Sequence, residues 1–115
     1  MEIKKGDIVL CQFYFSDTKT FKNRPVLVLK NNLPFDDFVA VAISSKIEKL
    51  YFDEVVISQS DFLSGGLPLS SKVMMRKTFV ASQTAIQKRY GTLSMQSYKK
   101  LHRHFCSYFD CVENN

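Results

Sequence analysis

Short apolar runs of strand length are the feature that most limits what this chain can fold into. Three of them follow one another near the N-terminus: IVLCQFYF (8–15), PVLVLK (25–30) and FVAVAI (38–43). Apolar runs of this length, bounded by turn-forming residues, indicate strands that are buried on both faces. The polar segments between them, residues 16–23 and 31–37, indicate loops.

The second half of the chain adds more strands and then changes character. Further strands are predicted at residues 52–57 and 72–82, with residues 85–93 as a short partner of the latter. Residues 64–71 contain paired glycines and a proline, which predicts a loop. In residues 94–109, apolar side chains recur at helical spacing after Ser94, which is a suitable N-cap. Several short strands followed by one C-terminal helix predict a mainly β fold, built as a strongly bent antiparallel sheet or small barrel.

Length and composition fit one domain that spans residues 1–115. With 45% hydrophobic residues, the chain is long enough to bury a core. No apolar run approaches the roughly 20 residues of a membrane helix, and no signal-peptide core follows Met1, so we expect a cytoplasmic protein with no membrane partner. The chain has three cysteines, Cys11, Cys106 and Cys111. Because this number is odd, at least one thiol must be unpaired, which indicates reduced thiols rather than a disulfide framework.

The basic residues are unevenly balanced by acidic ones along the chain. Residues 1–57 contain eight Lys/Arg and eight Asp/Glu, whereas residues 58–115 contain eight Lys/Arg and three Asp/Glu. The second half therefore carries the whole net charge of +5. Such a distribution fits a polyanionic partner such as nucleic acid, and it equally fits an ordinary solvated surface.

Arg24 and Ser44 each border one of the apolar runs. Arg24 precedes Pro25, which pushes it into an extended backbone where a loop becomes a strand. Ser44 directly follows the third run. If these two strands are antiparallel neighbours, the guanidinium and the hydroxyl point at a common spot, and that pair suits a phosphate diester. The alternative is that Arg24 forms a strand-end ion pair with Asp7 or Asp36.

The two loops that flank this pair carry further candidates for nucleic-acid contact. Lysines can follow a phosphate backbone, and aromatic side chains can stack on unpaired bases. The alternative is that the lysines are solvated and the aromatic rings pack under their own loops. The candidates are Lys19, Phe21 and Lys22 in the first loop, and Lys46, Lys49 and Tyr51 in residues 44–51. Arg76 and Lys77, on a later strand, fit either a basic face or a partner contact.

The sequence lacks the motifs of a metal centre. His102 and Cys106 are four residues apart and could share a helix face, whereas His104 points elsewhere. Two ligands do not close a zinc site, and no CxxC or HExxH motif accompanies them. Cys11 lies in a buried type of strand with no histidine nearby in the sequence, which argues against a thiol nucleophile. We expect no metal and no cofactor.

The segment GDIVLCQFYFSDTKTFKNRPVLVLK resembles the opening of the MazF/PemK family of toxin endoribonucleases. That opening is Gly-Asp-[Ile/Val] with an apolar strand, then a polar loop and Arg-Pro before aliphatic residues. Here the corresponding segments are Gly6-Asp7-Ile8 and Arg24-Pro25-Val26. The family's next strand ends in Ile-Thr or Thr-Ser, and this chain has Ile43-Ser44-Ser45. A weaker likeness continues through VMMRKTFVA, YGTLS and the final helix.

This resemblance implies a small SH3-like barrel with a C-terminal helix, assembled as a homodimer. It implies a metal-independent, sequence-selective endoribonuclease that cuts single-stranded RNA (mRNA) by 2′-hydroxyl attack, leaving a 2′,3′-cyclic phosphate and a 5′-hydroxyl. A cognate antitoxin is the implied protein partner. Arg24 would stabilise charge on the phosphate, and Ser44, with Ser45 as the second candidate, would donate a hydrogen bond to it.

The chain departs from the family pattern at two positions. The family's catalytic Thr corresponds to Ser44, and where some members carry a Glu in the first loop this chain has Lys19, with Asp17 as the nearest acid. The general base is therefore unassigned. Two other functions stay open: a gyrase-poisoning toxin of the same fold, and a non-catalytic RNA-binding module. The gyrase-poisoning family ends in a Trp-containing tail, and this chain has no Trp.

Overall fold

The computed structural model describes residues 2–15 and 19–111. Within these residues, the strands pair antiparallel in one sheet of order β4-β6-β3-β2-β1-β7-β5, and a single α-helix follows. The elements are β1 (Asp7–Phe15), β2 (Thr20–Lys30), β3 (Asp37–Ser44), β4 (Glu54–Ile57), β5 (Phe62–Gly65), β6 (Ser71–Ser82), β7 (Ile86–Leu93) and α1 (Met95–Tyr108), with 3-10 turns at Pro34–Asp36, Gln59–Asp61 and Gln83–Ala85. The predicted mainly β fold with a C-terminal helix is confirmed.

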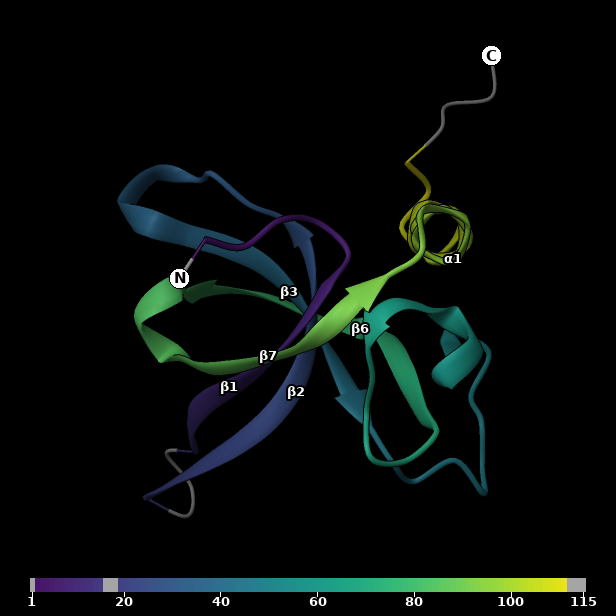
Figure 1. Cartoon of the computed structure of the whole chain (residues 1–115), viewed down its shortest axis with the longest axis horizontal. Helices are drawn as coiled ribbons and strands as arrows, with labels where there is room; N and C mark the ends of the chain where they lie inside the picture. The colour runs from purple at the N-terminus through teal and green to yellow at the C-terminus, as the bar shows by residue number, and fades with distance from the viewer. Residues whose placement is uncertain (1, 16–18, 112–115) are drawn as a thin grey trace.

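The sheet is strongly bent, as the sequence predicted. Figure 1 shows the strands fanning around a common centre, with α1 on one side and the β1–β2 hairpin extending away from it on the other. Its two edges are β4 and β5, and no ladder joins them among the described residues. No helix in residues 2–15 and 19–111 is long and apolar enough to cross a membrane.

The central strands bury both of their faces, and this explains their continuous apolar runs. Side chains alternate along a strand, so neighbouring residues enter different cores. Ile8, Leu27 and Val41 belong to one core cluster, which also includes Tyr98 and Leu101 of α1. The other cluster is formed by Ile3, Val9, Cys11, Val26, Val28, Phe38 and Ala40.

The Gly-Asp pair before β1 has a structural explanation. Gly6 has φ +94°, a conformation that favours glycine, and its N–H donates to the Val28 carbonyl at 2.9 Å. Its own carbonyl accepts from the Leu93 N–H at 2.9 Å. The fully buried carboxylate of Asp7 accepts from Thr92 Oγ1 at 2.7 Å. Residues 6 and 7 therefore connect β1 with β2 and β7.

Two segments predicted as loops contain strand. β2 begins at Thr20 rather than after residue 23, because the β1–β2 pairing continues to Phe15 opposite Thr20 and satisfies backbone groups there. β5 (Phe62–Gly65) overlaps the predicted loop 64–71, because Gly65 pairs with Gly91 of β7. A Cβ on Gly65 would lie 2.2 Å from the Tyr90 carbonyl oxygen, so only glycine allows this approach.

The prediction that the whole first strand is buried on both faces was wrong. Gln12 and Tyr14 are exposed, because the second half of β1 runs into the projecting hairpin, where Phe13 packs against a core cluster and the opposite face is open to solvent. In contrast, the predicted C-terminal helix is accurate. The Ser94 hydroxyl accepts a hydrogen bond from the Ser97 N–H at 3.1 Å and caps α1.

Candidate functional site

Arg24 and Ser44 come together through the register of two neighbouring strands. β2 and β3 are antiparallel, and Val26 lies opposite Ala42. Continuing this register by two residues sets Arg24 opposite Ser44. Both residues line one pocket of about 260 Å³, together with Ser45 and Lys46. The expected meeting of Arg24 and Ser44 is thus present in the structure, although Arg24 lies inside β2 and not at its start.

The hydroxyl groups of this pocket differ in what they can still bind. Ser44 Oγ accepts a hydrogen bond from the Lys46 N–H at 3.1 Å, so its own proton remains available for a ligand. The Ser71 hydroxyl instead donates to the Leu69 carbonyl at 2.9 Å. Of these two hydroxyls, Ser44 is therefore the one placed to act as a donor. The rest of the lining is Asn23, Pro25, Ile43, Leu67, Pro68, Leu69 and Tyr90.

The ion pairs considered for Arg24 are not those that the structure forms. The Asp7 carboxylate is bound by Thr92 and lies 3.3 Å from the Nε of Arg89. Asp36 follows the opposite end of β2, in the turn before β3. Arg24 itself is exposed at the start of the buried part of β2, beside the pocket.

The candidates from the first loop lie on the β1–β2 hairpin. Lys19 precedes β2 with φ 52°, and Lys22 pairs with Phe13 of β1. The ring of Phe21 is 64% exposed and lies 5.0 Å, centroid to centroid, from the ring of Tyr14, a residue that the sequence did not single out. Asp17 lies outside the described residues.

Lys49 and Tyr51 belong to a separate cluster and do not line the Arg24 pocket. The Tyr51 ring is half exposed, with three basic groups over it. The ring centroid lies 5.0 Å from Lys49 Nζ, 5.9 Å from Lys72 Nζ and 5.3 Å from Arg76 Cζ. Contact of these residues with RNA stays a prediction.

An ion cluster around the buried carboxylates of Asp53 and Glu54 holds this second loop against β6. The ammonium of Lys72 lies 2.8 Å from Glu54 Oε1 and donates to the Lys49 carbonyl at 3.0 Å. Arg76 Nη1 lies 2.7 Å from Glu54 Oε2 and 2.9 Å from Asp53 Oδ1. Lys72 also pairs with Ser44 in the β3–β6 ladder, so the cluster adjoins the candidate site. The sequence did not reveal it, because the partners meet only through the strand register.

The environment of Glu54 sets a pH dependence of stability. Burial acts to raise the pKa of Glu54, but hydrogen bonds from Lys72, the Tyr51 N–H and Arg76 outweigh it and lower the pKa from 4.5 to about 2. This stabilisation is complete above the unfolded-state pKa and is lost as the pH falls through the folded-state value. Integrated over the shift, it amounts to roughly 3 kcal/mol.

We therefore expect the free energy of unfolding of the wild type to converge on that of Glu54→Gln as the pH falls from about 5 to about 2.5. Urea unfolding followed by circular dichroism at several pH values measures both proteins. Glu54→Gln removes the titrating group and so serves as the control for all other carboxylates. A gap between the two proteins that stays constant across this range contradicts the assignment.

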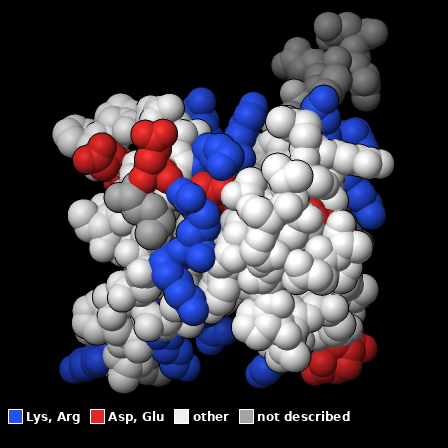
Figure 2. Space-filling view, viewed as in Figure 1, with Lys and Arg blue, Asp and Glu red and all other residues white. Residues whose placement is uncertain are grey.

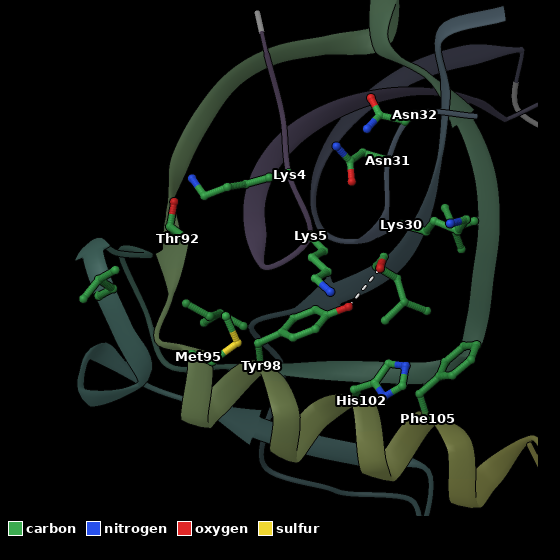
Figure 3. Close-up of a pocket in the computed structure, with 14 residues that line it drawn as sticks. Lys4, Lys5, Lys30, Asn31, Asn32, Thr92, Met95, Tyr98, His102 and Phe105 are labelled. Atoms are coloured by element: carbon green, nitrogen blue, oxygen red, sulfur yellow. Dashed lines mark hydrogen bonds between the residues drawn. The ribbon is translucent and has the colours of Figure 1, made fainter. Parts of the chain in front are cut away.

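A larger cavity, of about 870 Å³, lies elsewhere, between the N-terminal segment, the β2–β3 turn and α1. Figure 3 shows Lys5 and His102 pointing into it and the Tyr98 hydroxyl donating to a backbone carbonyl, that of Leu29, at 2.9 Å. Burial raises the pKa of Tyr98. None of the predicted site residues lines this cavity.

The histidines and cysteines of α1 do not converge on a metal site. Cys106 Sγ lies 3.9 Å from the ring nitrogens of His102, as the four-residue spacing predicts. In residues 2–15 and 19–111, no group of three or more His, Cys, Asp or Glu side chains is arranged to hold a metal ion.

Basic side chains gather on the surface of the folded protein. Figure 2 shows Lys and Arg in a band down the middle of one face and again at the lower left, where Figure 1 places the end of the β1–β2 hairpin. Acidic side chains lie near the upper end of the band. A surface of this kind can attract a polyanion by long-range electrostatics.

Comparison with known proteins identifies the family and the fold of the chain. Residues 4–109 match the model of the family described as PemK-like, MazF-like toxin of type II toxin-antitoxin system. No match was found among curated protein sequences. Solved structures share the fold. One is described as an endoribonuclease in complex with its cognate antitoxin from Mycobacterial species, with a TM-score of 0.75 and 16% identity over 98% of this chain and 100% of that one.

Two further structures agree with this match. The Mycobacterium tuberculosis toxin MazF-mt6 has a TM-score of 0.67 and 20% identity, covering 90% of this chain and 96% of that chain. The MazE-MazF complex (Form-II) from Deinococcus radiodurans has a TM-score of 0.69 and 16% identity, covering 95% and 96%. At these identities, the likeness shows that the folds are the same.

Proposed function

Because the chain belongs to the family of PemK-like, MazF-like toxins of type II toxin-antitoxin systems, we propose that it is a sequence-selective endoribonuclease that cleaves single-stranded RNA, including mRNA. The observation that carries this proposal is the convergence of Arg24 and Ser44 on one pocket, which Lys46 also lines. Structures with the same fold are described as endoribonucleases, which supports the same activity here.

The proposed reaction uses the substrate's own 2′-hydroxyl as the nucleophile. Its oxygen attacks the adjacent phosphorus, and the bond from phosphorus to the 5′-oxygen breaks. The 2′-hydroxyl loses a proton and the leaving 5′-oxygen gains one, which gives a 2′,3′-cyclic phosphate and a 5′-hydroxyl. No metal or cofactor is required for these steps, because charge stabilisation and alignment can come from side chains.

Arg24 and Ser44 fit two of these tasks. The planar guanidinium of Arg24 matches two phosphate oxygens, and its charge opposes the negative charge that grows on them. Ser44 donates a hydrogen bond to the same phosphate, because its oxygen already accepts from the Lys46 N–H. The proposal assigns no general base, since no carboxylate or imidazole lines the pocket within the described residues.

The family also suggests where and with what this protein acts. We place its activity in the cytoplasm, where mRNA is found, and its partners are a cognate antitoxin and a second copy of the chain. Two solved structures of the same fold are described as complexes with an antitoxin or as MazE-MazF, which supports the first partner.

The proposal is tested by incubating the purified, antitoxin-free protein with a long single-stranded RNA in EDTA and mapping the product ends. We expect discrete cuts that leave 5′-hydroxyl ends, with a shared sequence around them. Intact RNA after incubation with correctly folded protein would reject the ribonuclease function. RNA that is bound but never cut would instead identify a non-catalytic RNA-binding module.

In the same assay, Ser44→Ala is expected to lower kcat by about 10²–10³, the usual effect of removing one donor to a developing negative charge. Ser45→Ala is the matched control, because both serines line the pocket but the hydroxyl of Ser44 is the one oriented by the Lys46 N–H. We expect the kcat of Ser45→Ala to stay within about fivefold of the wild type, a smaller decrease than the loss of a complete donor causes. The reverse order of effects would make Ser45 the donor.

A further inference from the structure

A second pocket lies against Arg24 and contains none of the serines. Its volume is about 340 Å³, and it shares Arg24 and Ile43 with the pocket described above that Arg24 and Ser44 line. The other lining residues are Phe13, Tyr14, Ala42, Met74, Lys77 and Phe79. A ligand group bound at Arg24 can therefore have one part beside the serines and another part in this second pocket.

An irregularity in β6 creates the second pocket. Val41 of β3 lies opposite Thr78 and Ile43 lies opposite Val73, so four residues of β6, Met74–Lys77, stand against Ala42 alone. These residues leave the β3–β6 ladder, although Met74 stays paired with Glu54 of β4. Extra residues of this kind are typical of β-bulges, which are common next to functional sites. Within this bulge Arg76 turns toward Asp53 and Glu54, whereas Lys77 lines the pocket.

The walls of the second pocket are mainly aromatic and aliphatic. The rings of Phe13 and Phe79 meet edge to face, with 4.9 Å between their centroids. Tyr14 is 53% exposed and pairs with the exposed ring of Phe21. Exposed aromatic rings next to cationic side chains form the usual platform for unpaired bases.

We propose that this second pocket binds one unpaired base of the RNA substrate, adjacent to the phosphate held at Arg24, and that Lys77 selects this base by donating a hydrogen bond to it. The inference rests on the proposed ribonuclease function and assigns part of its sequence selectivity. A single nucleotide spans both pockets in this arrangement, with its phosphate at Arg24 and its base against Tyr14.

The chemistry of the lining also favours particular bases. Arg24 and Lys77 are the charged groups of the pocket, and both can only donate hydrogen bonds. The Tyr14 hydroxyl can both donate and accept, but no carboxylate or amide side chain among the described lining residues is present to accept from an exocyclic amino group. The pocket therefore favours a base with a carbonyl oxygen in that place: uracil over cytosine, and guanine over adenine.

The test is a cleavage profile on a single-stranded RNA library of random sequence, in EDTA, with the cut sites read by sequencing. The wild type is compared with Lys77→Met and with Lys100→Met, which removes the same charge from an exposed position on α1. We expect the wild type to prefer uracil or guanine at one position beside the cut. In Lys77→Met this preference falls about tenfold at that position alone, while Lys100→Met keeps the wild-type profile.

A second variant tests the stacking part of the proposal. Tyr14→Leu is expected to raise KM about tenfold for an oligonucleotide of the preferred sequence, with little change in kcat and the same base preference. Both Lys77 and Tyr14 are exposed, so these variants keep the fold, which circular dichroism verifies.

Each outcome separates the base pocket from the ribonuclease function. A wild type that does not cut RNA rejects the function, and the base pocket falls with it. A wild type that cuts, with a Lys77→Met profile identical to its own, rejects the base pocket alone. The same rejection follows if Lys100→Met changes the profile as much as Lys77→Met, because the effect is then one of net charge.

Discussion

Replacing Arg24 with alanine is expected to lower kcat for RNA cleavage by at least about 10²–10³, the effect of losing one preorganised stabiliser of transition-state charge. The loss falls on kcat rather than on KM, because the guanidinium acts on charge that grows during the reaction. Arg24 is an exposed residue of β2, just before the buried part of that strand, so its removal should leave the free energy of unfolding within about 0.5 kcal/mol of the wild type.

Arg24→Lys is the matched control for this prediction. Lysine keeps the charge but loses the planar fork that binds two phosphate oxygens, so we expect only partial recovery of kcat. Single-turnover cleavage and fluorescence anisotropy, measured on the same oligonucleotide, separate chemistry from binding. Wild-type kcat in Arg24→Ala, with unchanged binding, would show that Arg24 is structural. If Arg24→Ala loses RNA binding and the wild type does not cleave RNA, the protein would be an RNA-binding module.

The second large effect concerns stability. Lys72→Met is expected to lower the free energy of unfolding by about 3 kcal/mol, the low end of the roughly 3–5 kcal/mol cost of leaving a buried charge without its partner. The low end applies because Arg76 still contacts the Glu54 carboxylate, at 2.7 Å. The Lys49 carbonyl also loses its donor, which loosens the loop before β4.

The double variant Lys72→Met with Glu54→Gln is the control for this mechanism. Removing both charges eliminates the unpaired buried carboxylate, so we expect it to be more stable than Lys72→Met alone. Urea unfolding at neutral pH gives all three free energies. Lys72→Met within about 0.5 kcal/mol of the wild type, the range of ordinary surface substitutions, would show that the pair does not hold the loop.

Much of the fold could be predicted from local patterns. The runs at 25–30 and 38–43 are continuous because both faces of β2 and β3 are buried, and the apolar spacing behind Ser94 marks α1 correctly. The hairpin end of β2 and the short strand β5 could not be predicted this way. Their polar or glycine-containing residues become strands through pairing with β1 and β7, which local sequence does not encode.

Part of the candidate site could likewise be predicted from the sequence, and part could not. Arg24 and Ser44 mark the ends of two apolar runs, so an antiparallel register was enough to predict that they meet. The ion cluster around Glu54 and the pocket that includes Lys77 depend on how β6 pairs with β4 and β3, including a bulge of four residues against one. Nothing in the local sequence near Lys77 signals that bulge.

The proposed cleavage by 2′-hydroxyl attack is tested most directly with a substrate that lacks the nucleophile. An oligonucleotide with the preferred cut site is prepared with ribose throughout and, in parallel, with a single 2′-deoxyribose on the 5′ side of the scissile phosphate. We predict that the wild type binds both equally and cuts only the all-ribose strand, leaving a 2′,3′-cyclic phosphate. Cleavage of the 2′-deoxy strand at the same bond would contradict the mechanism, because a water or protein nucleophile would then be at work.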